Sequence, residues 1–217
     1  MKSRLLMTVC LLFALSYVAL PKGDSALSGD QALQKLVQGN KQYKRVAFLH
    51  PNQSLARRKA VAKGQSPFAI ILSCSDSRVP PEIIFDQGLG DLFVVRVAGN
   101  VLNDNALGSI EYAAEHFNVP LVMVLGHQRC GAVDAAVKGG EAPGHIGSLV
   151  EAIRPAVEKT RGKPGDPVDN AVRANVEMVV DQLKDSKPIL AELVHSGKLK
   201  VVGARYDLDT GGVEIIH

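Results

Sequence analysis

Short apolar runs alternate with longer segments of helical periodicity along most of the chain. Three runs have the length and composition of strands: 68–72, 91–98 and 120–125. Apolar residues recur at helical spacing over 28–46, which predicts an amphipathic helix. Further helices are predicted for a basic stretch ending at Gly64 and for 105–117, 130–137, 144–161 and 169–183. Two closing strands follow, 199–203 and 212–216, joined through a turn at 209–212. This alternation predicts an α/β fold with a mainly parallel β-sheet flanked by helices.

Polar residues indicate where two helices begin and where a site would lie. Ser28 or Asp30 is placed to cap the first helix, and Asp104 to cap the helix over 105–117. Parallel sheets bind ligands in the loops beyond the carboxyl ends of their strands. Because Cys74 follows the first predicted strand and His127 the third, we expect these two side chains to converge.

The first 26 residues carry a separate pattern. Lys2 and Arg4 precede an apolar run over 5–20, and small and polar residues follow at 22–26. This pattern predicts a secretory signal peptide over 1–26, a catalytic domain over 27–217, and a periplasmic or secreted product. An uncleaved amino-terminal anchor is the alternative, although the run is short for a membrane span of about 20 residues. Membrane contact is expected only if the segment stays uncleaved.

Composition excludes some classes of partner. The chain is 46% hydrophobic and 22% charged, with a formal net charge of +3 and no tryptophan. These values are typical of a globular protein. We expect no nucleic-acid partner, because no dense basic stripe with interleaved aromatic residues is present.

The cysteines suggest a metal site. Cys10 lies in the amino-terminal apolar run, which leaves Cys74 and Cys130 in the mature chain. In an oxidising compartment these two either form a disulfide or bind a metal. Cys74, His127 and Cys130 offer two thiolates and an imidazole, a ligand set suited to zinc, and the spacing of the last two predicts ligands about one turn apart at a helix start.

Asp76 decides whether such a site is open or closed. Three protein ligands leave a tetrahedral zinc with one free position, the catalytic pattern, whereas Asp76 as a fourth ligand would close it. Arg78 carries a guanidinium fork that can hold the Asp76 carboxylate and keep it away from the metal. We therefore interpret Asp76 as serving the fourth position, with closure as the alternative.

Two motifs carry a resemblance to a known family. Residues 74–82 (CSDSRVPPE) and 126–132 (GHQRCGA) resemble the signature segments of the β-class carbonic anhydrases, and residues 85–96 and 108–113 are also similar to that family. The likeness runs from about Gly29 to the carboxyl end. It implies a zinc enzyme in which zinc-bound hydroxide reversibly converts carbon dioxide to bicarbonate and a proton. Cys74, His127 and Cys130 would be the metal ligands, with water or Asp76 as the fourth.

The resemblance also implies roles for residues near the metal. Asp76 and Arg78 match the dyad that orients the nucleophile. Gln53 matches a substrate-binding glutamine of a readily active bacterial subgroup, and Phe93 matches an aromatic residue that lines the substrate pocket. The absence of tryptophan argues against the subgroup that bicarbonate inhibits. Family members usually form homodimers or homotetramers, and we expect one of these here.

Two other functions remain open from the sequence. Some relatives act on carbon disulfide or carbonyl sulfide with the same zinc ligands, and access to the pocket rather than ligand identity separates the substrates. A non-catalytic zinc- or bicarbonate-binding protein, closed by Asp76, is the second alternative. Arg78 argues against closure, because a closed site needs no residue to restrain the aspartate.

Overall fold

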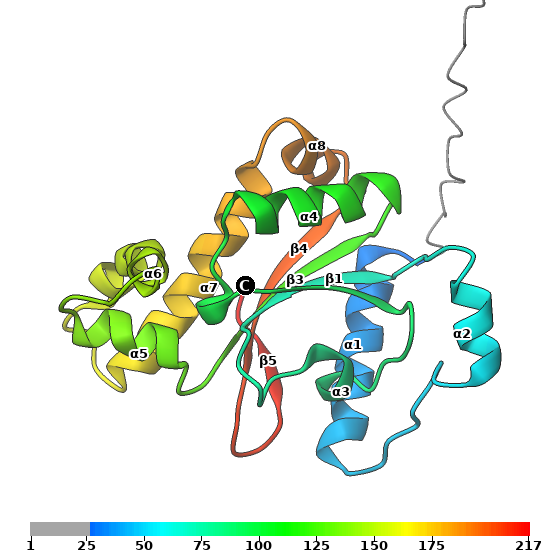
Figure 1. Cartoon of the computed structure of the whole chain (residues 1–217), viewed down its shortest axis with the longest axis horizontal. Coiled ribbons are helices and arrows are strands. Elements are labelled where there is room, and N and C mark those ends of the chain that lie inside the picture. The colour runs from blue at the N-terminus through cyan, green and yellow to red at the C-terminus, as the bar shows by residue number, and fades with distance from the viewer. Residues whose placement is uncertain (1–26) are drawn as a thin grey trace, which may run out of the picture.

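The computed structural model describes residues 27–217 and contains one five-stranded sheet there, in the order β2-β1-β3-β4-β5 (Figure 1). The strands are β1 (Ala69–Ser73), β2 (Leu92–Arg96), β3 (Leu121–His127), β4 (Lys200–Tyr206) and β5 (Val213–Ile215). The first four are parallel, and β5 pairs antiparallel with β4. The predicted mainly parallel sheet is thus confirmed.

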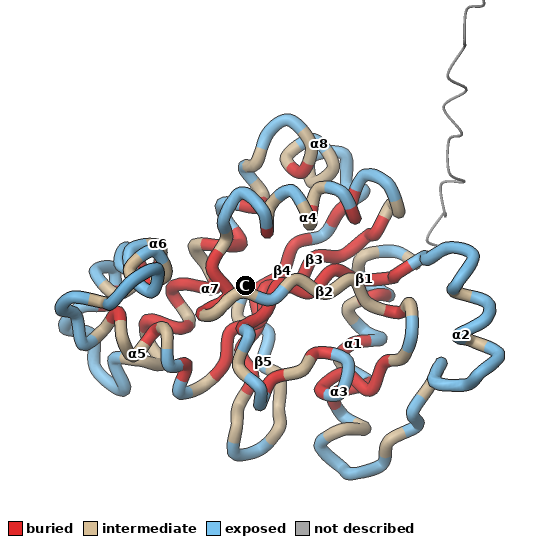
Figure 2. The backbone as a smooth tube through the Cα atoms, viewed as in Figure 1, coloured by how far each residue is buried: buried red, intermediate tan, exposed pale blue. Residues whose placement is uncertain are grey.

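The central strands are buried on both faces. Every residue of β1 and β3 is buried, whereas the edge strand β2 is mostly half-buried (Figure 2). Continuous apolar runs form such strands because a parallel sheet has helices over both of its faces. Successive side chains of β1 point to opposite faces, so Ile71 joins one core cluster and Ile70 the other.

Helices cover both faces of the sheet (Figure 1). The cluster containing Ile70 also includes buried residues of α4 (Asp104–His116) and α8 (Ile189–His195). The cluster containing Ile71 includes residues of α1 (Gly29–Lys44), α5 (Gly131–Lys138) and α6 (Ile146–Thr160). The long helix α7 (Pro167–Asp185) contributes to both clusters. Two short helices, α2 (Leu55–Val61) and α3 (Pro81–Ile84), lie in the connections around β1.

The predicted elements are present with shifted ends. Ser28 caps α1 in a capping box with Gln31, as one of the two predicted alternatives. The cap of α4 is Asn103 rather than Asp104, which becomes the first helical residue. Helices α3 and α8 were not predicted; α3 has only 4 residues, which is too short to show a helical period.

Both alternatives for the amino terminus, a signal peptide and an uncleaved anchor, concern residues 1–26. The signal peptide assigned to 1–26 falls outside the described residues. In the part that is described, no helix is both long enough and apolar enough to cross a membrane.

Gly39 allows α1 to pass close to the backbone that follows α3. A Cβ atom at Gly39 would lie 1.8 Å from the carbonyl oxygen of Phe85, which directly follows α3. We expect Gly39→Ala to destabilise the fold by about 3 kcal/mol, because the obstructing atom is backbone and must move. Gly108→Ala is the control: the site lies within α4 with nothing within 4 Å, and alanine there should stabilise by about 0.5–1 kcal/mol. Urea denaturation of both variants measures the difference, and equal midpoints would contradict this close approach.

Candidate metal centre and active site

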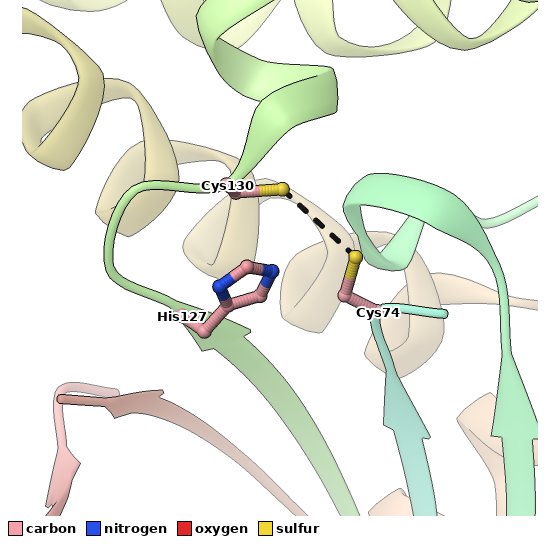
Figure 3. Close-up of side chains that lie close together, drawn as sticks. All are labelled: Cys74, His127 and Cys130. Carbon is pink, nitrogen blue, oxygen red and sulfur yellow. Dashed lines mark hydrogen bonds between the residues drawn. The ribbon is translucent and has the colours of Figure 1, made fainter. Parts of the chain in front are cut away.

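Two adjacent strands bring the predicted metal ligands together. Cys74 directly follows β1, His127 is the last residue of β3, and β1 and β3 are hydrogen-bonded neighbours. Cys130 stands at the start of α5 as its N-cap residue. The three side chains point toward one another (Figure 3), and one donor atom from each lies within 4.8 Å of the others. The predicted convergence is confirmed.

The path from His127 to Cys130 differs from the prediction. The two residues do not lie one turn apart in a helix, because β3 extends through His127 and α5 begins only after Cys130. The chain reverses between them at Arg129, whose φ of 52° is in the left-handed region. Strand pairing with β4 carries β3 two residues beyond its predicted end.

The imidazole of His127 is oriented for metal binding. Its Nδ1 lies 2.9 Å from the carbonyl oxygen of Gln128, and a carbonyl can only accept, so Nδ1 carries the hydrogen. This leaves Nε2 with its lone pair. Nε2 is buried and has no hydrogen-bond partner among the described residues. A buried acceptor without a partner fits a metal ligand, and a backbone carbonyl commonly fixes the tautomer of such a histidine.

The thiols of Cys74 and Cys130 are in direct contact. Their sulfurs are 3.9 Å apart and buried. The hydrogen bond between them is the main cause that lowers the pKa of Cys74 and raises the pKa of Cys130. The backbone N–H of Gly99 also donates to the Cys74 sulfur at 3.2 Å. Two sulfurs and one imidazole nitrogen, buried and mutually close, are the donor set of a zinc site with one open position.

Asp76 is held by Arg78 beside this donor set. The guanidinium of Arg78 donates to both carboxylate oxygens, from Nε at 2.9 Å and from a terminal nitrogen at 2.7 Å, and its backbone N–H donates at 2.9 Å. These bonds lower the pKa of Asp76 to about 2, with the side-chain bond as the main cause. The Asp76 oxygen nearest the ligands lies 3.8 Å from Nε2 of His127. An ionised carboxylate therefore stands at the edge of the metal position, restrained in the way that the sequence predicted.

Arg96 fixes the backbone that carries Cys74 and Asp76. Its guanidinium donates to the carbonyl oxygen of Cys74 at 3.0 Å and to that of Asp76 at 2.6 Å. Arg96 is the last residue of β2, the strand that pairs with β1, so a side chain from the edge strand stabilises the loop that follows β1. We did not predict this role. The position of an arginine at a strand end was visible in the sequence, but its carbonyl partners were not.

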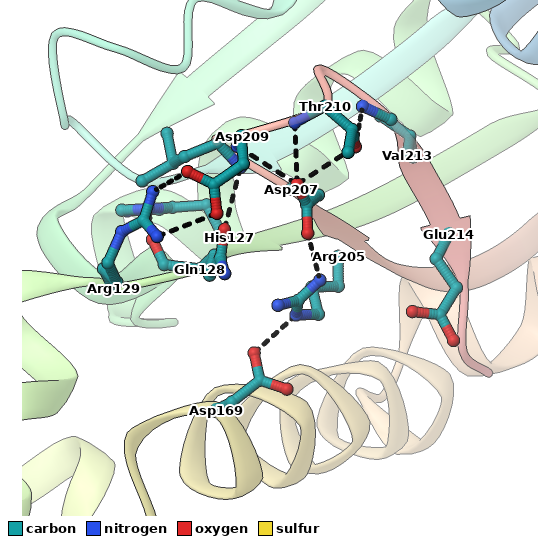
Figure 4. Close-up of polar contacts among 12 residues, drawn as sticks. His127, Gln128, Arg129, Asp169, Arg205, Asp207, Asp209, Thr210, Val213 and Glu214 are labelled. Carbon is teal, nitrogen blue, oxygen red and sulfur yellow. Dashed lines mark hydrogen bonds and ion pairs between the residues drawn. The ribbon is translucent and has the colours of Figure 1, made fainter. Parts of the chain in front are cut away.

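The segment from His127 to Cys130, which carries two of the three metal ligands, is hydrogen-bonded to the turn between β4 and β5 (Figure 4). Asp209 accepts two hydrogen bonds from the guanidinium of Arg129, at 2.9 and 2.7 Å. The side chain of Gln128 accepts from the backbone N–H of Leu208, and the Gln128 N–H donates to the carbonyl of Tyr206. The two residues that separate His127 from Cys130 are thus both attached to the 206–209 segment.

Asp207 organises that turn. One of its carboxylate oxygens accepts from the backbone N–H groups of Asp209 and Thr210 and from the Thr210 hydroxyl, and these bonds lower the pKa of Asp207, with the Thr210 backbone bond as the main cause. A carboxyl whose pKa is lowered by folding stabilises the protein above its unfolded pKa of about 3.9, and that contribution is lost as the pH falls through the folded value.

We therefore expect Asp207→Asn to cost on the order of 1 kcal/mol at pH 7, because solvent weakens hydrogen bonds at this half-buried position. The difference from wild type should shrink as the pH falls below about 4, through the lowered pKa of the folded wild-type carboxyl. Denaturant unfolding at several pH values measures it. A difference that stays constant with pH would show that the charge of Asp207 does not stabilise the turn.

The structure separates Gln53 and Phe93 from the metal ligands of the same chain. Gln53 is exposed and lines a groove of about 420 Å³ with residues of 82–92, and the three ligands do not line this groove. Phe93 packs near Phe117 in the cluster beside α4, whereas Cys74 and Cys130 belong to the cluster on the other face. Their substrate roles remain predictions.

Comparisons with known proteins agree with this site. The sequence model of the carbonic anhydrase family matches residues 69–213. Carbonic anhydrase 2 of Mycobacterium tuberculosis is 44% identical over 184 residues, covering 83% of this chain and 89% of the relative.

Two solved structures are similar in fold. A β-carbonic anhydrase of Aspergillus fumigatus is 28% identical, with a TM-score of 0.66 over 86% of this chain and 89% of its own. A tetrameric β-carbonic anhydrase of Sordaria macrospora is 24% identical, with a TM-score of 0.69 over 82% and 90%. This protein therefore belongs to the β-class carbonic anhydrases, zinc enzymes that reversibly hydrate carbon dioxide to bicarbonate and a proton.

Proposed function

We propose that this carbonic anhydrase is a readily active enzyme whose open metal position is served by Asp76. The observation that carries the proposal is the fork between Arg78 and Asp76. Both carboxylate oxygens are engaged by Arg78, so the carboxylate is turned toward the guanidinium while one oxygen stays 3.8 Å from Nε2 of His127. A carboxylate in this position can accept a hydrogen bond from a water or hydroxide bound beside the ligands without taking the place of that water or hydroxide.

The residues of the chain have distinct tasks in this proposal. Cys74, His127 and Cys130 would hold the zinc, which would supply the Lewis acidity that lowers the pKa of a coordinated water to about 7. Asp76 stays ionised throughout the neutral range and would orient the attacking oxygen by accepting a hydrogen bond from it. Arg78 prevents Asp76 from rotating onto the metal. Arg96 keeps Cys74 and Asp76 in register by holding both of their carbonyls.

We further propose that Gln53 and Phe93 bind substrate at the metal site of a second copy of the chain. Leu89 lines the Gln53 groove and is 44% exposed. Other large apolar side chains from the flanking segments of the chain are more exposed still: Val46, Leu49, Leu55 and Ile83. Exposed apolar patches of this kind indicate a protein interface. An assembled homodimer or homotetramer would cover them, and the tetrameric relative supports such an assembly.

Mixing two inactive variants tests the shared site. Cys74→Ser removes a metal ligand, and Gln53→Ala removes the proposed substrate contact. If Gln53 serves the partner, a mixed dimer contains one intact site, and random 1:1 reassembly should restore about a quarter of wild-type activity. If Gln53 serves its own chain, no mixed dimer has an intact site and activity stays at the level of the separate variants. Light scattering of the same samples checks the subunit number.

We also propose that the protein is exported. Lys2, Arg4 and the apolar run over 5–20 support a secretory signal, and only Cys74 and Cys130 would then meet the oxidising compartment. Zinc bound to both thiolates would protect them from forming a disulfide. Expression in a bacterium followed by fractionation and intact mass measurement tests this. A periplasmic protein shortened by about 26 residues is expected, whereas a full-length cytoplasmic protein would refute export.

Carbon disulfide and carbonyl sulfide remain the competing substrates for the same ligands. The relatives reported above are named carbonic anhydrases, which favours carbon dioxide. Turnover of each gas by one zinc-loaded preparation separates these activities. We expect hydration of carbon dioxide to exceed the other two by orders of magnitude.

A further inference from the structure

Helix α7 buries one polar side chain within an apolar face. Its buried residues are Ala171, Val172, Ala174, Asn175, Val176, Val179, Val180 and Leu183. Asn175 is the only one with a polar side chain, and it is only 1% exposed. Burying a primary amide is costly unless the amide is hydrogen-bonded, so its partner bears on why an asparagine stands there.

The partner of Asn175 leads directly to a metal ligand. Its amide nitrogen Nδ2 donates to the carbonyl oxygen of Gly99 at 2.9 Å, and this assignment is fixed because a carbonyl can only accept. The N–H of the same Gly99 donates to the sulfur of Cys74 at 3.2 Å. Both hydrogen bonds are buried. Asn175 therefore reaches Cys74 through a single intervening residue.

Gly99 needs an external restraint to hold this orientation. It lies in the short 3₁₀ helix η1 (Ala98–Asn100) with φ 68° and ψ 19°, a left-handed conformation in that helix. A Cβ atom there would lie 2.7 Å from the Cδ1 of Ile153, so a side chain at this position would require Ile153 to shift as well as a strained backbone. Glycine adopts this left-handed conformation without steric strain, but its backbone is also freer than that of other residues to leave it. The hydrogen bond from Asn175 removes part of that freedom on the carbonyl side of Gly99.

We propose that Asn175 is a positioning residue for the metal centre. It holds Gly99 so that the Gly99 N–H points at the Cys74 sulfur, and it thereby sets the zinc affinity of the site and the electron donation from that thiolate. A buried N–H···S bond stabilises negative charge on sulfur, because the surroundings screen it little. Residues that hold ligand-contacting groups in this way commonly change metal affinity by about 10- to 100-fold when they are replaced.

The inference rests on the zinc site but not on the identity of the substrate. Its test uses zinc binding and cobalt spectra, which report on the thiolates whether or not the protein hydrates carbon dioxide. If the proposed role of Asp76 in hydration is wrong, zinc affinity and cobalt spectra still test the role of Asn175. If Asn175 has no positioning role, the proposed role of Asp76 is unaffected.

Two substitutions remove the donor in opposite ways. Asn175→Leu fills the site without an N–H group, and Asn175→Ala empties it, so an effect shared by both variants reports the lost hydrogen bond rather than a change in volume. If one variant does not fold, the other still provides the measurement. Val179→Ala is the matched control, because it shortens another buried side chain on the same helix.

The expected result has two parts. Competition with a chelator should show zinc affinity lowered by about 10- to 100-fold in both Asn175 variants and changed by less than about twofold in Val179→Ala. The cobalt-substituted Asn175 variants should also show a shifted thiolate-to-cobalt charge-transfer band. If the Asn175 variants lose thermal stability as Val179→Ala does, but keep wild-type zinc affinity and the wild-type cobalt spectrum, Asn175 has only a packing role and the proposal is wrong.

Discussion

Cys74→Ser should lose zinc and carbon dioxide hydration together. A serine hydroxyl is a poor replacement for a thiolate, because it stays protonated at neutral pH and is a harder donor. The substitution also replaces the large sulfur that contacts Cys130 and accepts from the Gly99 N–H with a smaller oxygen. Replacing a residue that only supports a metal ligand commonly lowers metal affinity by about 10- to 100-fold. Because Cys74 is itself a ligand, we expect zinc affinity to fall by more than about 100-fold. Atomic absorption and stopped-flow hydration on one preparation measure both effects.

Ser75→Ala is the control for this experiment. Ser75 is the exposed neighbour of Cys74, so its replacement should leave one zinc per chain and wild-type turnover. Hydration by a zinc-free Cys74→Ser protein would overturn the metal mechanism. Full zinc retention by that variant would show instead that Cys74 is not a ligand.

Arg78→Ala should separate metal binding from catalysis. Arg78 touches Asp76 rather than the metal ligands' donor atoms, so zinc should remain at one per chain. Without the fork, Asp76 is free to rotate toward Nε2 of His127 and to occupy the open position. Its pKa should also rise from about 2 toward its ordinary value, because the hydrogen bond from Arg78 is the main cause of the lowered value. We expect hydration to fall by about 100-fold or more.

Two further variants sharpen the role of Arg78. Arg78→Lys keeps the charge but cannot donate two parallel hydrogen bonds, so it should restore only part of the activity. Arg154→Ala removes an exposed arginine paired with Glu151 and should leave hydration unchanged. If Arg78→Ala turned over at the wild-type rate with zinc bound, the Asp76–Arg78 pair would have no part in the reaction.

The metal ligands could be predicted because their chemistry and their position agreed. Two cysteines and a histidine are soft donors, and Cys74 and His127 each follow an apolar run with the pattern of a buried strand. Parallel strands place their carboxyl ends at one edge, so convergence followed from the fold class. The contact between Arg78 and Asp76 could also be predicted, because the two residues are close in sequence and their side chains have complementary charge.

The supports of the site could not be predicted, because they depend on backbone direction. The bond from Gly99 to Cys74 requires a left-handed glycine, and the bond that fixes the His127 tautomer requires the chain reversal at Arg129. Nothing local in the sequence indicates which carbonyl or N–H will face a side chain from a distant element. Asn175 had a visible signal, a polar residue within an apolar helical stripe, but its partner lies 76 positions away.

Stopped-flow hydration of carbon dioxide by the zinc-loaded protein, measured from pH 6 to pH 9 with zinc content determined on the same sample, tests the central claim most directly. An open site served by Asp76 predicts one zinc per chain and a turnover that rises with pH through about 7, where a zinc-coordinated water ionises. One zinc per chain with no hydration above the buffer rate at any of these pH values would contradict the account, because it would mean that the fourth position is closed.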